Sequence, residues 1–317
     1  MKKLISNTLL FILFASLLYI PFLFAWGRYA PSWFKPNINY RIGSYGHMYS
    51  RLSEIKNYKD IDILFLGSSH TYRSFDTRIF LDSGYKTFNL GSSAQTPVQT
   101  KVLLSRYLES LNPKLVIYEV YPATFNMDGV ESSLDIIAND INDSHSLEMA
   151  LKINNIKTYN TLIYGFIRDL LGLNSSFSEP TIKGNDKYIS GGYVEKELGF
   201  YKPTAFVKKK ISLRDYQLES FSEVVQLIKN KNIELMLVYA PITKVNYDSY
   251  SNTTYFDSIM KRYSNYYNFN EIIALNDTQH FDDAHHLNQN GVNIFNKKLI
   301  ELLNEDKART HNRVDKK

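Results

Sequence analysis

The sequence predicts an α/β fold in three layers, with a mostly parallel sheet between helices, preceded by one N-terminal transmembrane helix. Short apolar runs alternate with longer amphipathic segments from residue 57 onward, as in parallel sheets whose strands are joined by helices. A separate run without charged residues covers positions 4–27. The 317 residues, of which 44% are hydrophobic and 22% charged, can bury a substantial core.

The first apolar run, from Leu4 to Gly27, is long enough to cross a bilayer. At about 1.5 Å per residue, its 24 residues span roughly 36 Å. Lys2 and Lys3 precede the run, so the positive-inside rule predicts a cytoplasmic N-terminus. A cleaved signal peptide is the alternative, but the run exceeds the roughly 7–15 apolar residues of such peptides and no clean cleavage site follows it. We therefore expect an uncleaved single-pass anchor in the cell membrane, with everything after Trp33 extracytoplasmic.

The net charge of +5 does not indicate nucleic-acid binding. Two charges belong to Lys2 and Lys3, and two more to the C-terminal residues 305–317, which leaves about +1 for the folded part. Cysteine is absent, which excludes disulfides, cysteine nucleophiles and thiolate metal sites.

Four segments are expected along the chain. Residues 1–27 form a cytoplasmic tip and the anchor, 28–56 a membrane-proximal linker, 57–305 the α/β domain and 306–317 a basic polar tail. Each predicted strand is a short, mostly apolar run that stops at a turn-forming or polar residue. The predicted strands cover 61–66, 86–90, 115–121, 233–239 and 271–275, and the predicted helices cover 97–111, 213–231, 253–267 and 291–303.

The alternation of strands and helices is interrupted between about residues 123 and 204. This stretch contains an acidic, Asn- and Ser-rich piece at 128–146, a helical pattern at 147–173 and a glycine-containing loop. We interpret it as an insertion that folds over the edge of the sheet. Insertions of this kind often act as lids that set substrate choice.

The end of the first predicted strand carries a candidate nucleophile. The strand stops at Gly67-Ser68-Ser69, and a sharp turn from strand to helix can expose a serine hydroxyl among backbone N–H groups. The alternative is an ordinary turn whose serine caps the next helix. Gly91 ends the second strand, where it would let the backbone approach a reacting carbonyl and offer an N–H to an oxyanion.

A second candidate site precedes the last predicted helix. Asp283 and His286 stand three residues apart, so the histidine could offer one ring nitrogen to a serine while the carboxylate holds the other. The same loop could instead bind zinc or manganese, or be a solvated loop with Asn288 or Asn290 as a helix cap. The metal alternative would draw on His280, Asp282, Asp283, His285 and His286.

The order of these blocks along the chain resembles the SGNH/GDSL hydrolase superfamily over about residues 61–303. The resemblance implies a flavodoxin-like three-layer fold and a Ser-His-Asp triad that uses no metal or cofactor. By position, it makes Ser69 the nucleophile, His286 the base and Asp283 the acid that orients the base, with the N–H groups of Ser69 and Gly91 as oxyanion donors. His70 is expected only to shape the turn.

The third block of the family, a Gly-x-Asn-Asp after the third strand, is missing. The chain reads Tyr118-Glu119-Val120-Tyr121-Pro122 there, and Asn126 is only a remote substitute. This leaves one oxyanion donor without a candidate.

Together with the anchor, this departure resembles the extracytoplasmic branch of the superfamily, similar to D-alanyl-transfer and alginate O-acetylation proteins. The resemblance implies a membrane-anchored serine esterase or O-acyltransferase for short, acetyl-like acyl groups of a cell-surface polysaccharide. Such proteins often act beside a polytopic membrane-bound O-acyltransferase, which would be a second partner besides the glycan. One alternative is a non-catalytic SGNH-like scaffold that binds such an acyltransferase or a glycan. Another is metal-dependent hydrolysis.

Overall fold

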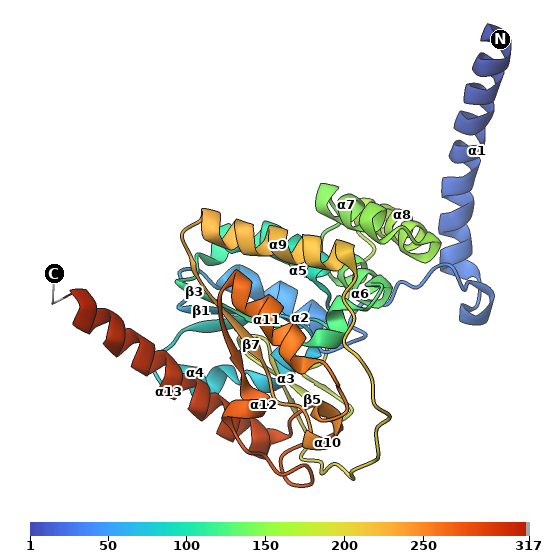
Figure 1. Cartoon of the computed structure of the whole chain (residues 1–317). Helices are drawn as coiled ribbons and strands as arrows, with labels where there is room; N and C mark the ends of the chain where they lie inside the picture. Colours follow the sequence, from blue (N-terminus) through green and yellow to red (C-terminus); the bar gives the residue numbers. More distant parts are fainter. Residues whose placement is uncertain (315–317) are drawn as a thin grey trace.

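A computed structural model describes residues 1–314, and side-chain surroundings for residues 1–306, and it confirms the α/β prediction. Five strands form one parallel sheet in the order β2-β1-β3-β7-β8 (Figure 1). This order is that of flavodoxin-like sheets, in which ligands bind beyond the carboxyl ends of β1 and β3, where the order reverses. The strands are β1 (Ile63–Leu66), β2 (Thr87–Asn89), β3 (Leu115–Glu119), β7 (Glu234–Tyr239) and β8 (Asn265–Asn268).

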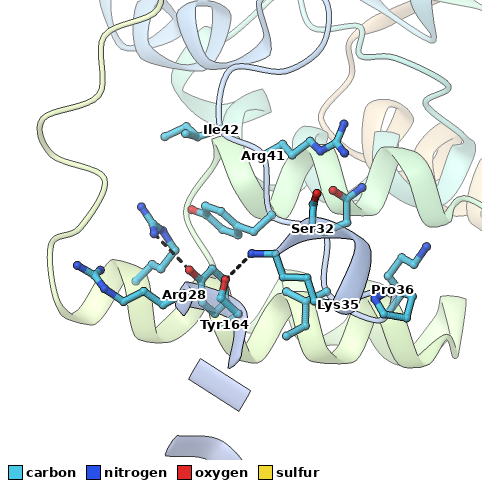
Figure 2. A pocket seen from close by; sticks show the side chains of 13 residues that line it. Arg28, Ser32, Lys35, Pro36, Arg41, Ile42 and Tyr164 are labelled. Carbon is cyan, nitrogen blue, oxygen red and sulfur yellow. Dashed lines mark hydrogen bonds between the residues drawn. The ribbon is translucent and has the colours of Figure 1, made fainter. Parts of the chain in front are cut away.

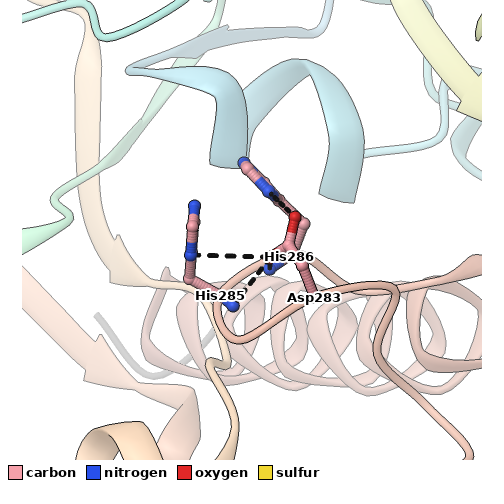
Figure 3. Close-up of side chains that lie close together, drawn as sticks. All are labelled: Asp283, His285 and His286. Atoms are coloured by element: carbon pink, nitrogen blue, oxygen red, sulfur yellow. Dashed lines mark hydrogen bonds and ion pairs between the residues drawn. The ribbon is translucent and has the colours of Figure 1, made fainter. Parts of the chain in front are cut away.

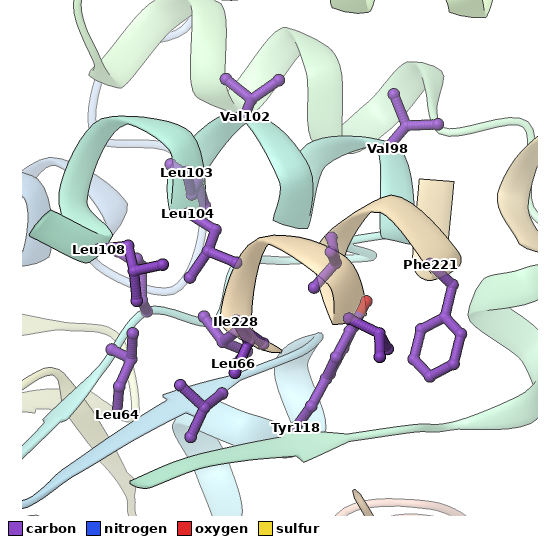
Figure 4. Close-up of a cluster of buried hydrophobic side chains, with 14 of the residues drawn as sticks. Leu64, Leu66, Val98, Val102, Leu103, Leu104, Leu108, Tyr118, Phe221 and Ile228 are labelled. Carbon is purple, nitrogen blue, oxygen red and sulfur yellow. The ribbon is translucent and has the colours of Figure 1, made fainter. Parts of the chain in front are cut away.

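Helices cover both faces of the sheet because alternate side chains of each strand point to opposite faces. Leu64 and Leu66 of β1 join a core with α5 (Pro97–Leu111) and α9 (Asp215–Asn230), shown in Figure 4. Ile63 and Phe65 point the other way. They pack in a second core with α4 (Thr77–Asp82), α12 (Phe269–Ile272) and α13 (Gln289–Val314).

The sequence places the ends of α5 correctly because its end signals are local. Thr96 and Gln99 form a capping box, and Pro97 occupies the first turn, where a missing N–H costs no hydrogen bond. Asn112 ends the helix in a left-handed conformation, with φ 42°.

The predicted interruption corresponds to three helices and a small sheet between β3 and α9. The helices are α6 (Val130–Asn139), α7 (Ser144–Ile153) and α8 (Ile156–Leu170), and the antiparallel strands are β4 (Ile182–Lys183), β5 (Asp186–Ile189) and β6 (Tyr193–Lys196). The single helical pattern expected at 147–173 is wrong. Asn154 ends α7 with φ 49°, and the Asn155 side chain caps α8 by accepting the Lys157 N–H. The small sheet meets the edge strand β2, where Asn89 N–H donates to Gly191 O over 2.7 Å.

The strand expected at 271–275 is also wrong. The fifth strand is β8, and α11 (Thr253–Tyr263) is correspondingly shorter than predicted. The Asn268 side chain accepts the Asn270 N–H and so starts the helix α12 over residues that looked like a strand. Helix α13 continues to Val314, into the predicted polar tail, whose last residues, 315–317, lie outside the described part of the chain.

Helix α1 (Lys2–Tyr29) is the long apolar helix that the sequence predicts, with a mean hydropathy of 2.3 in its most apolar window. Its side chains are exposed up to Phe22, while its last turns pack on α8 through Leu23 and Tyr164. Its length and composition are those of a membrane span or a signal sequence. The segment expected as a linker contains α2 (Met48–Glu54), whose apolar residues belong to the main core.

Candidate active site

The turn after β1 holds Ser69 at the start of the short helix α3 (Ser69–Ser74). Gly67 has φ 137°, and a Cβ there would lie 2.7 Å from Glu119 O, so only glycine fits between β1 and β3. Ser68 caps α3 by accepting the His70 N–H. As the first helical residue, Ser69 has an N–H without an acceptor inside the helix. The capping serine and the candidate nucleophile are therefore two neighbouring residues.

The structure brings Ser69, His286 and Asp283 into one hydrogen-bonded line, although the first two lie 217 positions apart. His286 Nε2 lies 2.8 Å from Ser69 Oγ, and His286 Nδ1 lies 2.8 Å from Asp283 Oδ2. The other carboxylate oxygen, Asp283 Oδ1, accepts the N–H groups of His285 and His286 at 2.9 Å each. With Nδ1–H donating to the carboxylate, Nε2 is left to accept the serine proton.

The carboxylate that holds His286 is kept ionised. Burial alone would raise the pKa of Asp283, but the hydrogen bond from His286 and, at acidic pH, the positive charges of protonated His286 and His285 hold that pKa far below its usual range. Burial, followed by the proximity of His286, lowers the pKa of His285 to about 4, so His285 is neutral near pH 7. Figure 3 shows both histidines around the carboxylate on their loop.

A direct connection ties α3 to the helix that follows the histidine loop. Asn296 of α13 donates from Nδ2 to Ser74 O over 2.6 Å and accepts the Asp76 N–H at 3.0 Å. Asn296 is fully buried. The element that carries Ser69 and the element that follows His286 are thus joined outside the sheet.

His70 lies under the site as a packing residue. Its Nδ1 is 3.1 Å from Ser68 Oγ, and its ring lies 4.1 Å from the Tyr121 ring and 5.0 Å from that of His286, centroid to centroid. Burial, and then the neighbouring His286 and His285, lower the pKa of His70 well below 6.5. A neutral imidazole in this position contacts both the turn at Ser68 and the ring of His286.

The predicted oxyanion donor Gly91 lies beside the turn, but its N–H already has an acceptor. A Cβ at Gly91 would lie 2.8 Å from Ser68 O, so the absence of a side chain permits the close approach that the sequence predicts. Its N–H donates to Asn89 Oδ1 over 3.1 Å. Gly91 would have to give up or share this bond to stabilise an oxyanion.

Glu119 stands where the missing third block would be, at the end of β3 beside Gly67. It is 2% exposed, and neither carboxylate oxygen has a hydrogen-bond partner among the described residues. Burial raises the pKa of Glu119 to about 8, and the nearby backbone amides of Ala240 and Tyr121 lower it only in part. A lone acid inside an apolar strand is the sequence signal that could have identified this residue. Asn126 is exposed at the end of a 3-10 turn (Pro122–Phe125), where its carbonyl accepts a bond from Arg214.

The residues of the metal alternative do not all converge. His280 Nδ1 accepts the Asn276 N–H, and Asp282 forms an ion pair with Lys196. Within the described part of the chain, the ligand atoms of Asp283, His285 and His286 lie within 4.8 Å of one another. Both ring nitrogens of His286 and both Asp283 oxygens already take part in hydrogen bonds, which fits a serine site better than a metal site.

Two solved structures found in comparisons with known proteins are only weakly similar to this chain. No family model and no curated protein sequence matches the chain. A Bacteroides fragilis structure described provisionally as an acylhydrolase is 12% identical, covering 83% of this chain and 98% of its own, with a TM-score of 0.42. A GDSL-like lipase from Bacteroides thetaiotaomicron is 11% identical over 82% of this chain and 98% of its own, with a TM-score of 0.41.

The resemblance to a known family therefore depends on features of the chain itself and not on these comparisons. The strand order, the glycine-serine turn after β1 and the Asp-x-x-His loop before the last helix are those that the sequence resemblance implies. In these features the chain resembles the SGNH/GDSL hydrolase superfamily.

Proposed function

We propose that the chain is a serine esterase or O-acyltransferase in which Ser69 is the nucleophile. The observation that carries the proposal is the line of contacts from Ser69 Oγ through both nitrogens of His286 to Asp283, each 2.8 Å long. A serine, a histidine and an anionic carboxylate in this order activate the serine for acyl transfer.

In the proposed reaction, Ser69 Oγ attacks the acyl carbonyl while His286 Nε2 takes the hydroxyl proton. The N–H groups of Ser69 and Gly91 hold the resulting oxyanion, the latter after releasing Asn89. The ester bond breaks as His286 returns the proton to the departing alcohol oxygen. A sugar hydroxyl or water, deprotonated by His286, then attacks the acyl-enzyme. The bond from the acyl carbon to Ser69 Oγ breaks, and His286 returns the proton to Ser69.

The proposed substrate is a short, acetyl-like acyl group on a cell-surface polysaccharide, as the family resemblance implies. An extracytoplasmic site would follow from α1 acting as an anchor with Lys2 and Lys3 in the cytoplasm. Arg28 and Lys35 follow the apolar run, and as free cations they would oppose this orientation under the positive-inside rule. Both side chains instead line a cavity of the folded domain. A polytopic membrane-bound O-acyltransferase is the proposed partner.

The test is covalent labelling of the full-length protein in neutral detergent with a fluorophosphonate, which reacts with activated serines. We expect modification of Ser69, no labelling of this position in Ser69→Ala, and a loss of about 10⁶-fold in labelling rate for His286→Ala. Ser83→Ala, at an exposed serine in the turn after α4, is the matched control and should label normally. Undiminished labelling of Ser69→Ala would refute the assignment.

A non-catalytic scaffold is the second candidate, because the third block is missing and Gly91 N–H is already bonded to Asn89. Such a scaffold would bind a glycan or a membrane acyltransferase with its surface. It predicts that Ser69→Ala restores surface acylation fully in a deletion strain, whereas the enzyme proposal predicts no restoration.

A further inference from the structure

A cavity of about 540 Å³ lies where α1, the following loop and α8 meet (Figure 2). Its lining includes five cationic side chains and, among the described residues, no acidic one. The five are Arg28, Lys35, Arg41, Lys157 and Arg168. They come from two parts of the chain more than a hundred positions apart, which α1 and α8 bring together.

These cations have no carboxylate partner in the described structure, unlike some of the arginines elsewhere in the domain. Arg73 and Arg106, for example, each form ion pairs with aspartates. In the cavity, Lys35 donates to Gly27 O over 2.7 Å, and Arg168 donates to the neutral acceptors Asn174 Oδ1 and Leu173 O. Neutral acceptors hold Lys35 and Arg168 in place without cancelling the charge of either side chain. Five like charges around one cavity repel each other, so an anion bound among them would be stabilised.

The position of the cavity along α1 places it at the surface of a membrane, provided that α1 is the anchor proposed above. The domain touches α1 from Tyr19 onward, where Tyr19 donates to Asn160 of α8 over 2.7 Å. From Leu4 to Tyr19 the helix rises only about 22 Å, less than the roughly 30 Å of the hydrocarbon core. Arg28 lies about 36 Å from Leu4, within the headgroup layer.

The helices next to the cavity carry exposed apolar side chains that suit this level. Leu147 and Leu151, one turn apart on α7, are half exposed or more, as are Ile156 and Leu170 at the two ends of α8. Figure 1 shows α8 beside the domain end of α1, and α7 next to α8 on the side away from α1. Apolar side chains beside a cationic cavity are typical of surfaces that lie on an anionic bilayer.

We propose that this cavity binds the phosphate-bearing headgroup of an anionic membrane lipid and thereby holds the domain against the bilayer. The cations would contact the phosphate, and the exposed leucines and isoleucine would contact the acyl-chain boundary. The site is separate from Ser69, and the same contacts would form with the lipids of either leaflet. The proposal rests on the anchor but not on the serine chemistry.

The test measures lipid binding by native mass spectrometry on the full-length protein in neutral detergent, with phosphatidylglycerol or phosphatidylcholine added. The probe variant is Arg41→Gln with Lys157→Gln, and the matched control is Lys202→Gln with Arg262→Gln, two exposed cations outside the cavity. Each cation near an anionic surface contributes about fivefold, so the probe variant should bind phosphatidylglycerol roughly 30-fold more weakly. The control should bind it as the wild type does.

Three results would overturn the lipid assignment. The first is equal binding of both lipids by the wild type, and the second is an equal loss in the control variant. The third is displacement of phosphatidylglycerol by millimolar inorganic phosphate, which would indicate a site for free anions. Retained fluorophosphonate labelling of the probe variant would separate this proposal from the one on Ser69, and carbonate extraction of membranes tests the anchor independently.

Discussion

Replacing Glu119 with glutamine should make the fold more stable at alkaline pH and leave it nearly unchanged at acidic pH. Glu119 is buried without a hydrogen-bond partner for its carboxylate, and burial raises its pKa from 4.5 to about 8. That difference corresponds to about 5 kcal/mol between the two protonation states. Glutamine has nearly the same shape and cannot ionise, so Glu119→Gln imitates the protonated acid.

The direction of the stability change follows from whether the folded or the unfolded state keeps the proton on Glu119. In the unfolded chain Glu119 loses its proton near pH 4.5, whereas the folded chain keeps it until about pH 8. The folded state therefore binds more protons between these values, and its stability falls as the pH rises through this window. Asp135, whose pKa burial raises to about 7, contributes in the same range but is present in both proteins, so its effect cancels in the comparison.

The assay is urea unfolding of the full-length protein in neutral detergent, with the folded fraction measured by a brief protease pulse. The advantage of Glu119→Gln should be small near pH 5 and grow towards about 5 kcal/mol near pH 8. A stability difference that stays constant between these two pH values would refute the reasoning, because it would mean that the carboxylate is solvated in the folded state.

Three further changes test other parts of the structure. Gly67→Ala should lower the unfolding free energy by about 2 to 4 kcal/mol, because the added methyl group meets the β3 backbone. The control Gly84→Ala is also at positive φ but has nothing within 4 Å of the added methyl group, and it should cost only about 1 kcal/mol. Arg106→Met removes the ion-pair partner of Asp140, which is almost fully buried, and of Asp143, and it should lower the unfolding free energy by about 3 to 5 kcal/mol. Lys114→Met, at an exposed ion pair, should have little effect. Asp283→Asn should slow fluorophosphonate labelling by about 10⁴-fold; an unchanged rate would remove the carboxylate from the proposed triad.

Much of the sheet and of the site could be predicted because the signals are local. The apolar run that ends at Gly67 marks both β1 and the turn, and Thr96 and Pro97 mark the start of α5. The pair Asp283 and His286 lies within one loop, so its spacing alone suggests a contact. Signals of this kind are contained in a few neighbouring residues.

Features that depend on distant partners could not be predicted. Strand β8 consists of Asn265-Tyr266-Tyr267-Asn268, which shows no strand-like apolar pattern and is a strand because β7 pairs with it. The bond from Gly91 N–H to Asn89 depends on a side-chain rotamer, and the charge state of Glu119 depends on burial that several elements create together. The five cations of the cavity are scattered over two segments until α1 packs on α8.

The hydrogen bonds of Asn296 affect which parts of the chain can vary in sequence without disturbing the site. They connect the serine helix α3 directly to α13, which follows the histidine loop, without passing through the helices α6–α8 inserted after β3. These three helices can therefore be lengthened or exchanged to accommodate a bulky polymer while the reacting groups stay aligned, whereas the small sheet is bound to both sides of the site by the Arg73–Asp186 and Lys196–Asp282 ion pairs. Selection of the substrate and alignment of the reacting groups become separable properties, and variation in one need not disturb the other.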